Sequence, residues 1–307
     1  MSPPPTRPPA ADGWDADLRL LLGEDAGELL AAVAGSAGGT LRRWRARQVD
    51  HRPDRFTMVQ YRADVEWPDG TTSTETFAAA GGERMPTEGA AVFADGSTRV
   101  AVWRWPCDPS LPGLAEALDA RKVASLLDDL GIGGGALQLR ARSYRPGRRA
   151  VIEATGRRGR LFLKVVPPAR AEALHRLHRS LAAGLPVPDS LGWTQSGVVV
   201  LDARPGQTLR EVLRTSRQQP PPPEAIVALL DRLPGELANG PARRDLVSAA
   251  EHHAAVLGAI IPDARDRLDL VLDRVRTAAG PAPEGVQPVH GDLYEAQLLV
   301  DRGRIAG

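Results

Sequence analysis

The segment RLFLKVVPPARAEALHRLHRSLAAGLPVP, residues 160–188, decides how the second half of the chain folds. It begins with a short apolar run, passes through two prolines, and continues with apolar residues at helical spacing over residues 169–184. Such a run predicts a strand followed by an amphipathic helix. The closing LPVP leads to two further apolar runs, LGW and GVVVLDA, which predict a pair of strands. We therefore expect strands, a helix and more strands in that order.

A lysine stands at the centre of the first of these strands. Lys164 and Lys122 are the only lysines in a chain whose other basic side chains are all arginine. An unpaired ammonium group is costly to bury, so we expect Lys164 to have an anionic partner or ligand. Glu172, early on the following helix, is the candidate partner. The alternatives are a strand-edge lysine that reaches water and a glutamate that faces solvent.

Two strand-rich blocks share a local sequence pattern. In residues 41–80, polar and apolar residues alternate around two turns, Arg52-Pro53-Asp54 and Pro68-Asp69-Gly70, and a hairpin at Asp95-Gly96 follows. Residues 137–168 form the second block. Its RAR and YRPGR echo RAR and HRPDR in the first block, which fits either a duplication or good turn chemistry alone. Trp103 and Trp105 alternate along a strand and are expected to pack in a core or between domains, rather than to form a platform on which bases stack.

The chain closes with the motif HGDLYEAQLLV, residues 290–300. Phosphoryl transfer from ATP needs a cation on the phosphates, magnesium ligands and a carboxylate that positions the acceptor hydroxyl. Asp292 lies on a loop five residues before Gln297, a spacing that places a base and an amide on one turn. Gly291 permits a close approach of the backbone. Together with Lys164 and Glu172, this motif predicts a phosphotransferase site.

These motifs resemble the aminoglycoside phosphotransferase and choline kinase family, whose fold is similar to that of protein kinases. The resemblance rests on FLKVV, the helix glutamate, GLPVP, VLDARPGQTL and HGDLYEAQLLV, and covers roughly residues 136–307. It implies that Asp292 is the catalytic base, supported by His290, and that Lys164 contacts the ATP phosphates while paired with Glu172. The backbone around Leu201 and Ala203 would hold adenine, and Gln297, where the family usually has asparagine, would be a ligand of Mg²⁺.

The resemblance also implies a domain plan of the α+β class with a protein-kinase-like bilobal fold. We expect a disordered Pro-rich tail over residues 1–12, an α+β cap domain over 13–130, a sheet lobe over 136–203 and a partial helical lobe over 204–307. The family places a second metal-binding aspartate and further helices beyond this point, so the chain resembles a C-terminally truncated kinase. Its terminal apolar strand is expected to be an exposed edge.

The function implied is transfer of the ATP γ-phosphoryl group to a hydroxyl of a small molecule, such as an aminoglycoside or a sugar. A nucleotide-binding protein without turnover is the alternative, favoured by Gln297 and by the missing aspartate. A metal-dependent hydrolase built from His252, His253, His290 and Asp292 would leave Lys164 unexplained. His175 and His178 share a helix face, but no third ligand is placed to complete a metal site with them.

A glycine turn, Arg145-Pro146-Gly147-Arg148-Arg149, stands where kinases fold a hairpin over the phosphates. Its backbone amides and Arg148 suit an anion.

The composition limits the partners and the compartment. Lys plus Arg number 39 against 38 Asp plus Glu, a balance that argues against nucleic-acid and membrane partners. The single cysteine, Cys107, fits a reducing compartment, and no signal peptide or long apolar run is present. We expect a cytoplasmic protein. The sequence predicts no particular oligomeric state and no particular acceptor.

Overall fold

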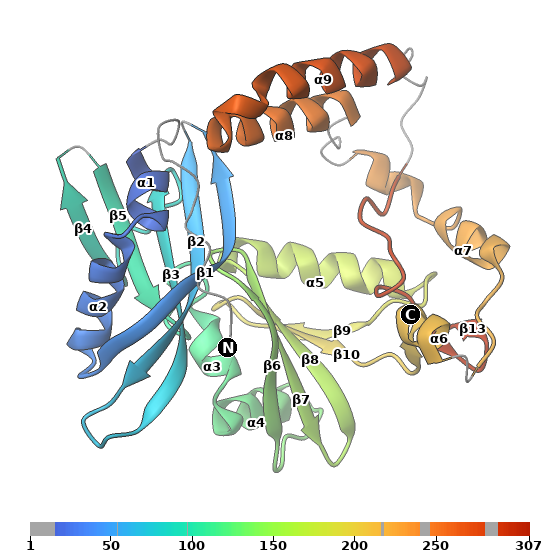
Figure 1. The fold of residues 1–307 in the computed structure, drawn as a ribbon. Helices are drawn as coiled ribbons and strands as arrows, with labels where there is room; N and C mark the ends of the chain where they lie inside the picture. Colours follow the sequence, from blue (N-terminus) through green and yellow to red (C-terminus); the bar gives the residue numbers. More distant parts are fainter. Residues whose placement is uncertain (1–15, 54, 97, 216–217, 240–245, 280–287) are drawn as a thin grey trace. The chain divides into compact units, whose positions relative to one another are not determined.

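A computed structural model describes residues 16–53, 55–96, 98–215, 218–239, 246–279 and 288–307. The predicted tail over residues 1–12 lies outside them. The chain is of the α+β class, with antiparallel sheets and separate helices, as the sequence predicted (Figure 1). It divides into two compact units. The first comprises residues 1–110, 145–147 and 244–282, and the second comprises 111–144, 148–243 and 283–307.

The first unit contains a five-stranded antiparallel sheet in the order β1-β2-β3-β5-β4. Its strands are β1 (Thr40–Arg52), β2 (Phe56–Glu66), β3 (Thr72–Gly82), β4 (Ala91–Asp95) and β5 (Thr98–Arg104). The predicted turn Pro68-Asp69-Gly70 lies between β2 and β3, and Gly70 has the positive φ of +80° that this turn requires. The predicted turn after β1 includes residue 54, which lies outside the described residues. The expected meander and hairpin are therefore confirmed.

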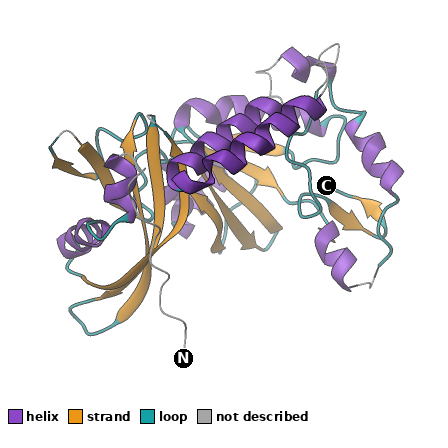
Figure 2. Cartoon of the chain, turned by 45° about the horizontal axis from the view of Figure 1, so that its top comes forward, coloured by secondary structure: helices purple, strands orange, loops and turns teal. Residues whose placement is uncertain are grey.

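Two short helices, α1 (Ala16–Leu22) and α2 (Ala26–Ser36), pack on one face of this sheet (Figures 1 and 2). Alternate residues of the strands form the core beneath them, because successive side chains of a strand point to opposite faces. The hydroxyl of Tyr61, which is buried, donates a hydrogen bond of 2.6 Å to the carbonyl of Leu21. This core consists mainly of Leu21, Leu30, Val59, Tyr61, Val65, Phe77, Val100 and Val102.

The other face of the sheet carries a smaller apolar cluster. It is formed by Phe56, Met58, Ala78, Ala80 and Trp103. Trp103 is 3% exposed, which confirms that this side chain packs in a core.

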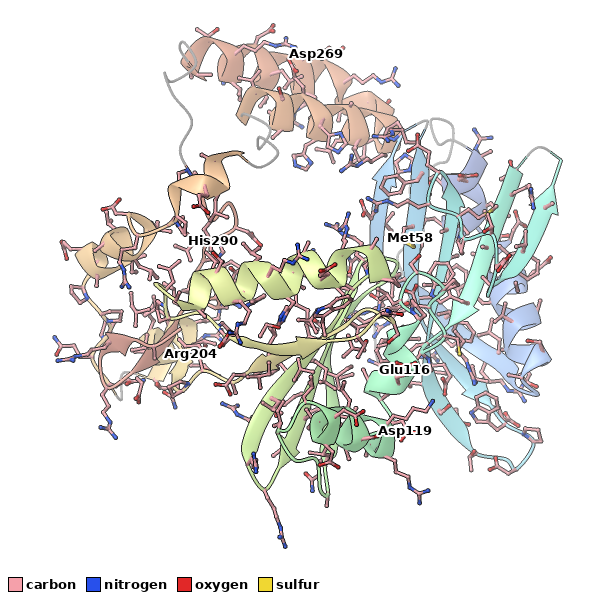
Figure 3. All side chains as sticks on the ribbon, turned by 180° about the vertical axis from the view of Figure 1, so that it is seen from behind. Met58, Glu116, Asp119, Arg204, Asp269 and His290 are labelled. Atoms are coloured by element: carbon pink, nitrogen blue, oxygen red, sulfur yellow. The ribbon has the colours of Figure 1, made fainter. Side chains whose placement is uncertain are left out.

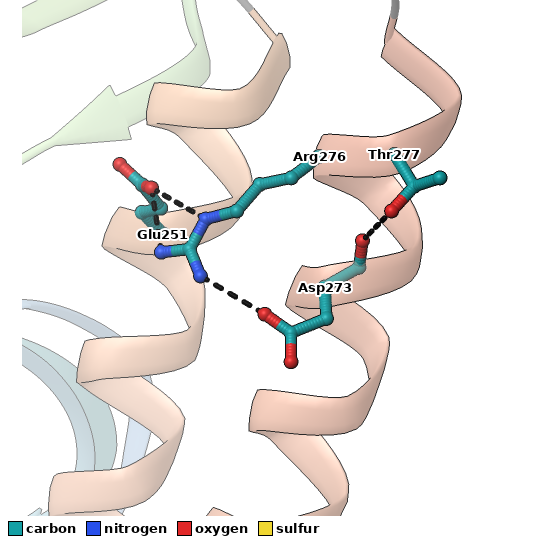
Figure 4. A network of polar contacts seen from close by, with 4 residues as sticks. All are labelled: Glu251, Asp273, Arg276 and Thr277. Atoms are coloured by element: carbon teal, nitrogen blue, oxygen red, sulfur yellow. Dashed lines mark hydrogen bonds and ion pairs between the residues drawn. The ribbon is translucent and has the colours of Figure 1, made fainter.

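A helical hairpin completes the first unit: α8 (Leu246–Ile260) and α9 (Arg265–Ala279) lie side by side. The guanidinium group of Arg276 joins them, donating to Glu251 Oε1 on α8 at 2.8 Å and to Asp273 Oδ1 on α9 at 3.2 Å (Figure 4). We expected these helices in the partial lobe over residues 204–307. The contact pattern assigns them to the first unit instead.

The second unit contains the other five-stranded sheet, in the order β6-β7-β8-β10-β9. Its strands are β6 (Gln138–Arg145), β7 (Arg149–Gly156), β8 (Gly159–Val165), β9 (Ser190–Trp193) and β10 (Val198–Asp202). Helix α5 (Pro168–Ala182) connects β8 to β9, and its first turn contains a proline, a residue that tolerates this position. The strand–helix–strand order read from residues 160–188 is therefore confirmed.

Helices α3 (Gly113–Ala117) and α4 (Ala120–Asp129) belong to this second unit rather than to a first domain ending at residue 130. The N–H of Gly113 donates to the carbonyl of Ser196 at 3.0 Å, and the Ser196 hydroxyl donates to Glu116 at 2.7 Å. Asp119 caps α4 by accepting from the backbone N–H groups of its first turn (Figure 3).

The remaining elements of the second unit are β11 (Gln207–Thr208), α6 (Leu209–Thr215), α7 (Pro223–Leu230), a 3₁₀ helix (Gly235–Asn239), β12 (Leu299–Asp301) and β13 (Arg304–Ile305). Strand β12 pairs with β11 on one side and with β13 on the other. Its expected role as an exposed edge was therefore wrong. Val300 and Leu298 pack against Leu209 and Val212 of α6.

Both large sheets follow the same order, in which the fifth strand lies between the third and the fourth. In each unit, two helices also precede the first strand. The shared order agrees with the echo between the two strand-rich blocks, although α5 has no counterpart between β3 and β4. None of the helices in the described ranges is long and apolar enough to cross a membrane.

Candidate functional site

Lys164 lies on β8, an interior strand of the second sheet. It is opposite Val151 of β7 and opposite Val199 of β10. Because side chains alternate along a strand, Lys164 shares its face with Phe162, while Leu163 and Val165 are fully buried on the other face. Lys164 is half-buried, so the strand-edge alternative does not apply.

A cavity of about 290 Å³ opens beside Lys164. Two cations, Lys164 and Arg149, share it with apolar groups. Burial lowers the pKa of Lys164 below its ordinary value, and the positive charge of Arg149 lowers the pKa further. The negative charge of a bound anion would act in the opposite direction and raise the pKa of Lys164. The cavity is lined by Ser143, Arg149, Val151, Phe162, Lys164, Pro188 and Leu201.

Glu172 does not pair with Lys164, contrary to the sequence prediction. It lies on an exposed face of α5 and forms an ion pair with Arg176, one turn further along the same helix. Ala171 is the residue of this turn that is buried against the sheet. Within the described ranges, no carboxylate forms an ion pair with Lys164. The alternative of a solvent-facing glutamate is the one that the structure supports.

His178 is the residue of α5 whose charge interacts with Lys164. Its Nδ1 lies 2.9 Å from the carbonyl oxygen of Pro188, a wall residue of the cavity, so Nδ1 carries the proton and donates it. Burial lowers the pKa of His178, and the positive charge of Lys164 also acts to lower it. His175 instead contacts the hydroxyl of buried Ser190 at 2.8 Å. Both histidines thus have structural partners, and no metal-binding group of His, Cys, Asp or Glu is found among the described residues.

The expected adenine contacts give a mixed result. Leu201 lines the cavity and pairs with Phe162 of β8. The backbone N–H of Ala203 donates to the carboxylate of Asp202 at 2.9 Å. Leu201 therefore lines the same cavity as Lys164, as expected for an adenine contact. The N–H of Ala203 already donates to Asp202, so it is not available to adenine in this structure.

The glycine turn before β7 differs from an open phosphate loop. Its Gly147 has a φ of +64°, and the Gly147 N–H donates to the carboxylate of Asp108 at 2.8 Å. The backbone N–H that we expected to bind an anionic ligand therefore donates to a carboxylate of the protein itself. Arg148 is exposed on this turn, and the next residue, Arg149, is the one that lines the cavity.

The loop at residues 290–297 brings the predicted base and amide together (Figure 3 marks His290). The Gln297 side chain donates from Nε2 to Asp292 Oδ2 at 3.3 Å. The Asp292 N–H approaches Nδ1 of His290 at 3.4 Å, and Gly291 has a φ of +81°. Asp292 and Gln297 are exposed, while Leu298 directly after them is buried. The loop is thus anchored by its strand and presents a carboxylate to solvent.

Lys164 and Asp292 both belong to the second unit, yet the cavity beside Lys164 is lined by neither Asp292 nor Gln297. In the described part of the chain, the structure therefore gives two groups, a dicationic cavity and a carboxylate loop. Oxygen ligands on the loop, Asp292 and Gln297 Oε1, are of the kind that Mg²⁺ accepts together with phosphate and water.

The sequence placed Arg149 in a turn suited to anions, but it did not predict that Arg149, Ser143 and Pro188 line the cavity. Strand alternation could have found the first, because Arg149 is two residues before Val151, which is opposite Lys164. No model of a known protein family matches this chain, and no curated protein sequence matches it.

Proposed function

We propose that this chain is an ATP-dependent phosphotransferase that moves the γ-phosphoryl group to a hydroxyl of a small molecule. The observation that carries the proposal is the cavity, in which Lys164 and Arg149 have no carboxylate partner among the described residues and lie beside Phe162 and Leu201. Two cations suit a phosphate tail, and the apolar walls suit a base. A nucleotide is a ligand that offers both.

The arrangement of the second sheet supports the protein-kinase-like part of the proposal. Its strand order, with the fifth strand between the third and the fourth, agrees with the sheet lobe that the sequence resemblance implies. The helix α5 between β8 and β9 and the central lysine of β8 agree with it as well.

In this proposal, Lys164 and Arg149 hold the phosphates of ATP and offset their charge. Asp292 accepts the proton of the acceptor hydroxyl as that oxygen attacks the γ-phosphorus, and the bond from the γ-phosphorus to the bridging oxygen of ADP breaks. Mg²⁺, when bound, would neutralise charge on the phosphates, and Gln297 Oε1 would be its ligand from this loop. The contact of 3.3 Å between Gln297 and Asp292 keeps the carboxylate oriented. We propose the cytoplasm as its compartment, because a reaction of this kind needs a supply of ATP.

A nucleotide-binding protein without turnover is the second candidate. It is favoured by Glu172, which pairs with Arg176 and leaves Lys164 without the carboxylate that an active kinase provides. It is also favoured by a cavity that Asp292 does not line.

ATP consumption in the presence of a panel of aminoglycosides and sugars tests the proposal. Asp292→Asn is expected to lower kcat by about 100-fold or more, with ATP affinity unchanged, because it removes a general base and leaves the cavity intact. Asp301→Asn, an exposed carboxylate on β12, is the matched control and should keep full activity. ATP binding without turnover on every acceptor would establish the second candidate. Failure of the wild-type chain to bind ATP would contradict both.

A further inference from the structure

An arginine-rich face lies on the first sheet, away from the cavity described above. It comprises Arg43, Arg45 and Arg47 of β1 and Arg62 of β2, and we call these four residues the basic face. Trp44 of β1 is opposite Ala63 of β2, and both pack in the core beneath α1 and α2. Because side chains alternate, Arg45 and Arg62 point to the opposite side of the sheet.

The four arginines are exposed, and none of their side chains has a hydrogen bond or an ion pair with another described residue. Other arginines of this sheet behave differently: Arg42 pairs with Glu66, and Arg84 pairs with Asp50. Asp64, which is opposite Arg43, accepts a hydrogen bond from the hydroxyl of Thr74 at 2.9 Å. Among the described residues, therefore, no carboxylate neutralises these four side chains by an ion pair.

Arg45 and Arg62 are directly opposite each other across the two strands. Residues in this relation have Cβ atoms about 4.5–5.5 Å apart, and like charges in such pairs destabilise a sheet. Two guanidinium groups at this spacing can converge on one phosphate, because each offers a planar fork of donors.

Protection of an exposed strand edge explains only part of this pattern. Arginines and bulges on an edge strand prevent pairing with other chains, and β1 is an edge strand with two register shifts. Arg62, however, is on β2, which pairs with β1 on one side and β3 on the other. An interior strand has no free edge that must be kept from pairing with other chains. Edge protection therefore does not explain why Arg62 is opposite Arg45.

We propose that the basic face binds single-stranded nucleic acid. Arg45 and Arg62 hold one phosphate. Arg43, two residues before Arg45, offers a further contact about 7 Å along β1, and Arg47 lies at the register shift between Ala46 and Gln48. Arg45, Arg62 and Thr76 form a row across β1, β2 and β3, because Thr76 is opposite Arg62. The carbonyl of Thr76 accepts a hydrogen bond from the N–H of Trp105 at 2.9 Å, so Trp105 lies at the end of this row. In this proposal a base stacks on the half-buried Trp105 at the end of the row, as bases stack on the aromatic side chains of other sheets that bind single strands.

This inference revises the conclusion drawn from total charge. The near balance of 39 basic and 38 acidic residues describes the chain as a whole. It does not describe a face on which four arginine side chains have no ion pair with a described residue. The carboxylates beside them on β2, Asp64 and Glu66, are held by Thr74 and by Arg42.

The test is fluorescence anisotropy of a labelled oligothymidylate of about 20 nucleotides with the full chain, at about 50 mM and about 200 mM salt. The variant Arg45→Gln with Arg62→Gln is expected to bind at least about tenfold more weakly at the lower salt. The slope of log K against log salt should be shallower by about 0.7 for this variant, because the two arginines hold one phosphate and each phosphate contact in a single strand contributes about 0.7. The variant Arg43→Gln with Arg47→Gln should also weaken binding.

The matched control is Arg157→Gln with Arg158→Gln, which removes the same charge from the exposed turn between β7 and β8. It should keep wild-type affinity, and thermal melting checks that every variant is folded. An equal loss in the control, or no binding by the wild-type chain at the lower salt, would overturn the proposal. Inorganic polyphosphate and polyglutamate are tested as competitors. If either displaces the labelled oligonucleotide as effectively as unlabelled oligonucleotide does, the partner is a polyanion other than nucleic acid. Excess ATP should not displace it, and displacement would assign the binding to the cavity.

Discussion

Replacing Asp108 with alanine should destabilise the first unit, because this carboxylate joins two segments that are far apart in the sequence. Asp108 is 2% exposed. It accepts from the N–H of Ser110 at 2.9 Å through one oxygen, and from the N–H of Gly147 at 2.8 Å through the other. In Asp108→Ala, the N–H groups of Ser110 and Gly147 lose the carboxylate that accepts their hydrogen bonds.

The magnitude follows from these two hydrogen bonds. A hydrogen bond to a charged group contributes about 1.5–3 kcal/mol, and Ser110 and Gly147 are half-buried, so water replaces part of the loss. We expect a cost of about 3 kcal/mol for Asp108→Ala. Asp108→Asn keeps one acceptor oxygen and should cost about half as much. For a unit of this size, about 3 kcal/mol corresponds to a fall in Tm of about 6–12 °C.

Thermal unfolding followed by circular dichroism measures this loss, and amide hydrogen exchange at Gly147 reports it locally. Exchange at Gly147 should become faster in Asp108→Ala. Asp129→Ala, which removes an exposed carboxylate at the end of α4, is the control and should leave Tm unchanged. A Tm within about 2 °C of the wild type for Asp108→Ala would refute the reasoning.

Three further predictions concern stability. Tyr61→Phe removes the hydrogen bond of 2.6 Å to the carbonyl of Leu21 and should cost about 1–2 kcal/mol in urea unfolding, and no change would show that α1 is held without this bond. Gly113→Ala places a Cβ 2.7 Å from Val198 Cγ2 and 2.8 Å from the Ser196 carbonyl, so it should lower Tm, which a neutral result would contradict. The pKa of Lys164 in the folded state is lower than its ordinary value of 10.5. At a pH between these two pKa values, the unfolded chain binds more protons than the folded chain, so the free energy of unfolding rises with pH. Lys164→Met should abolish that rise and stabilise the chain at neutral pH, and an unchanged pH profile would count against burial of the ammonium group.

The second sheet shows which features follow from local sequence. Apolar runs and turn residues predicted β8, α5 and the strands after it, because these elements are determined by periodicities of two and of 3.6 residues. The contact between Asp292 and Gln297 followed from their spacing on one loop, a purely local property. The burial of Lys164 followed from its place in an apolar strand.

The partner of Lys164 could not be predicted in the same way. Glu172 and His178 both lie on α5. Which of them faces the sheet depends on where the helix begins and how it is rotated about its axis. The buried position of the first turn is Ala171, which turns Glu172 toward solvent and toward Arg176. A rotation of this kind is set by packing against β9 and β10, which the pattern of a single helix does not contain.

The domain boundary depends on contacts between distant segments as well. Helices α3 and α4 follow the first sheet in the sequence, but the hydrogen bonds of Gly113 and Glu116 go to Ser196, about 80 residues later. The pairing of β12 with both β11 and β13 is likewise non-local. Sequence periodicity predicts the elements and does not predict these partners.

Labelling with an ATP acyl-phosphate probe tests the central claim, that the cavity beside Lys164 holds a nucleotide. The chain contains only two lysines, so Lys122, exposed on α4, is an internal control. Mass spectrometry should find the label on Lys164, with Lys122 unlabelled, and excess ATP should block the reaction. An acylating reagent without a nucleotide corrects for the reactivity that a lowered pKa gives to Lys164. Equal labelling of the two lysines, or labelling of Lys164 that ATP does not block, would contradict the account.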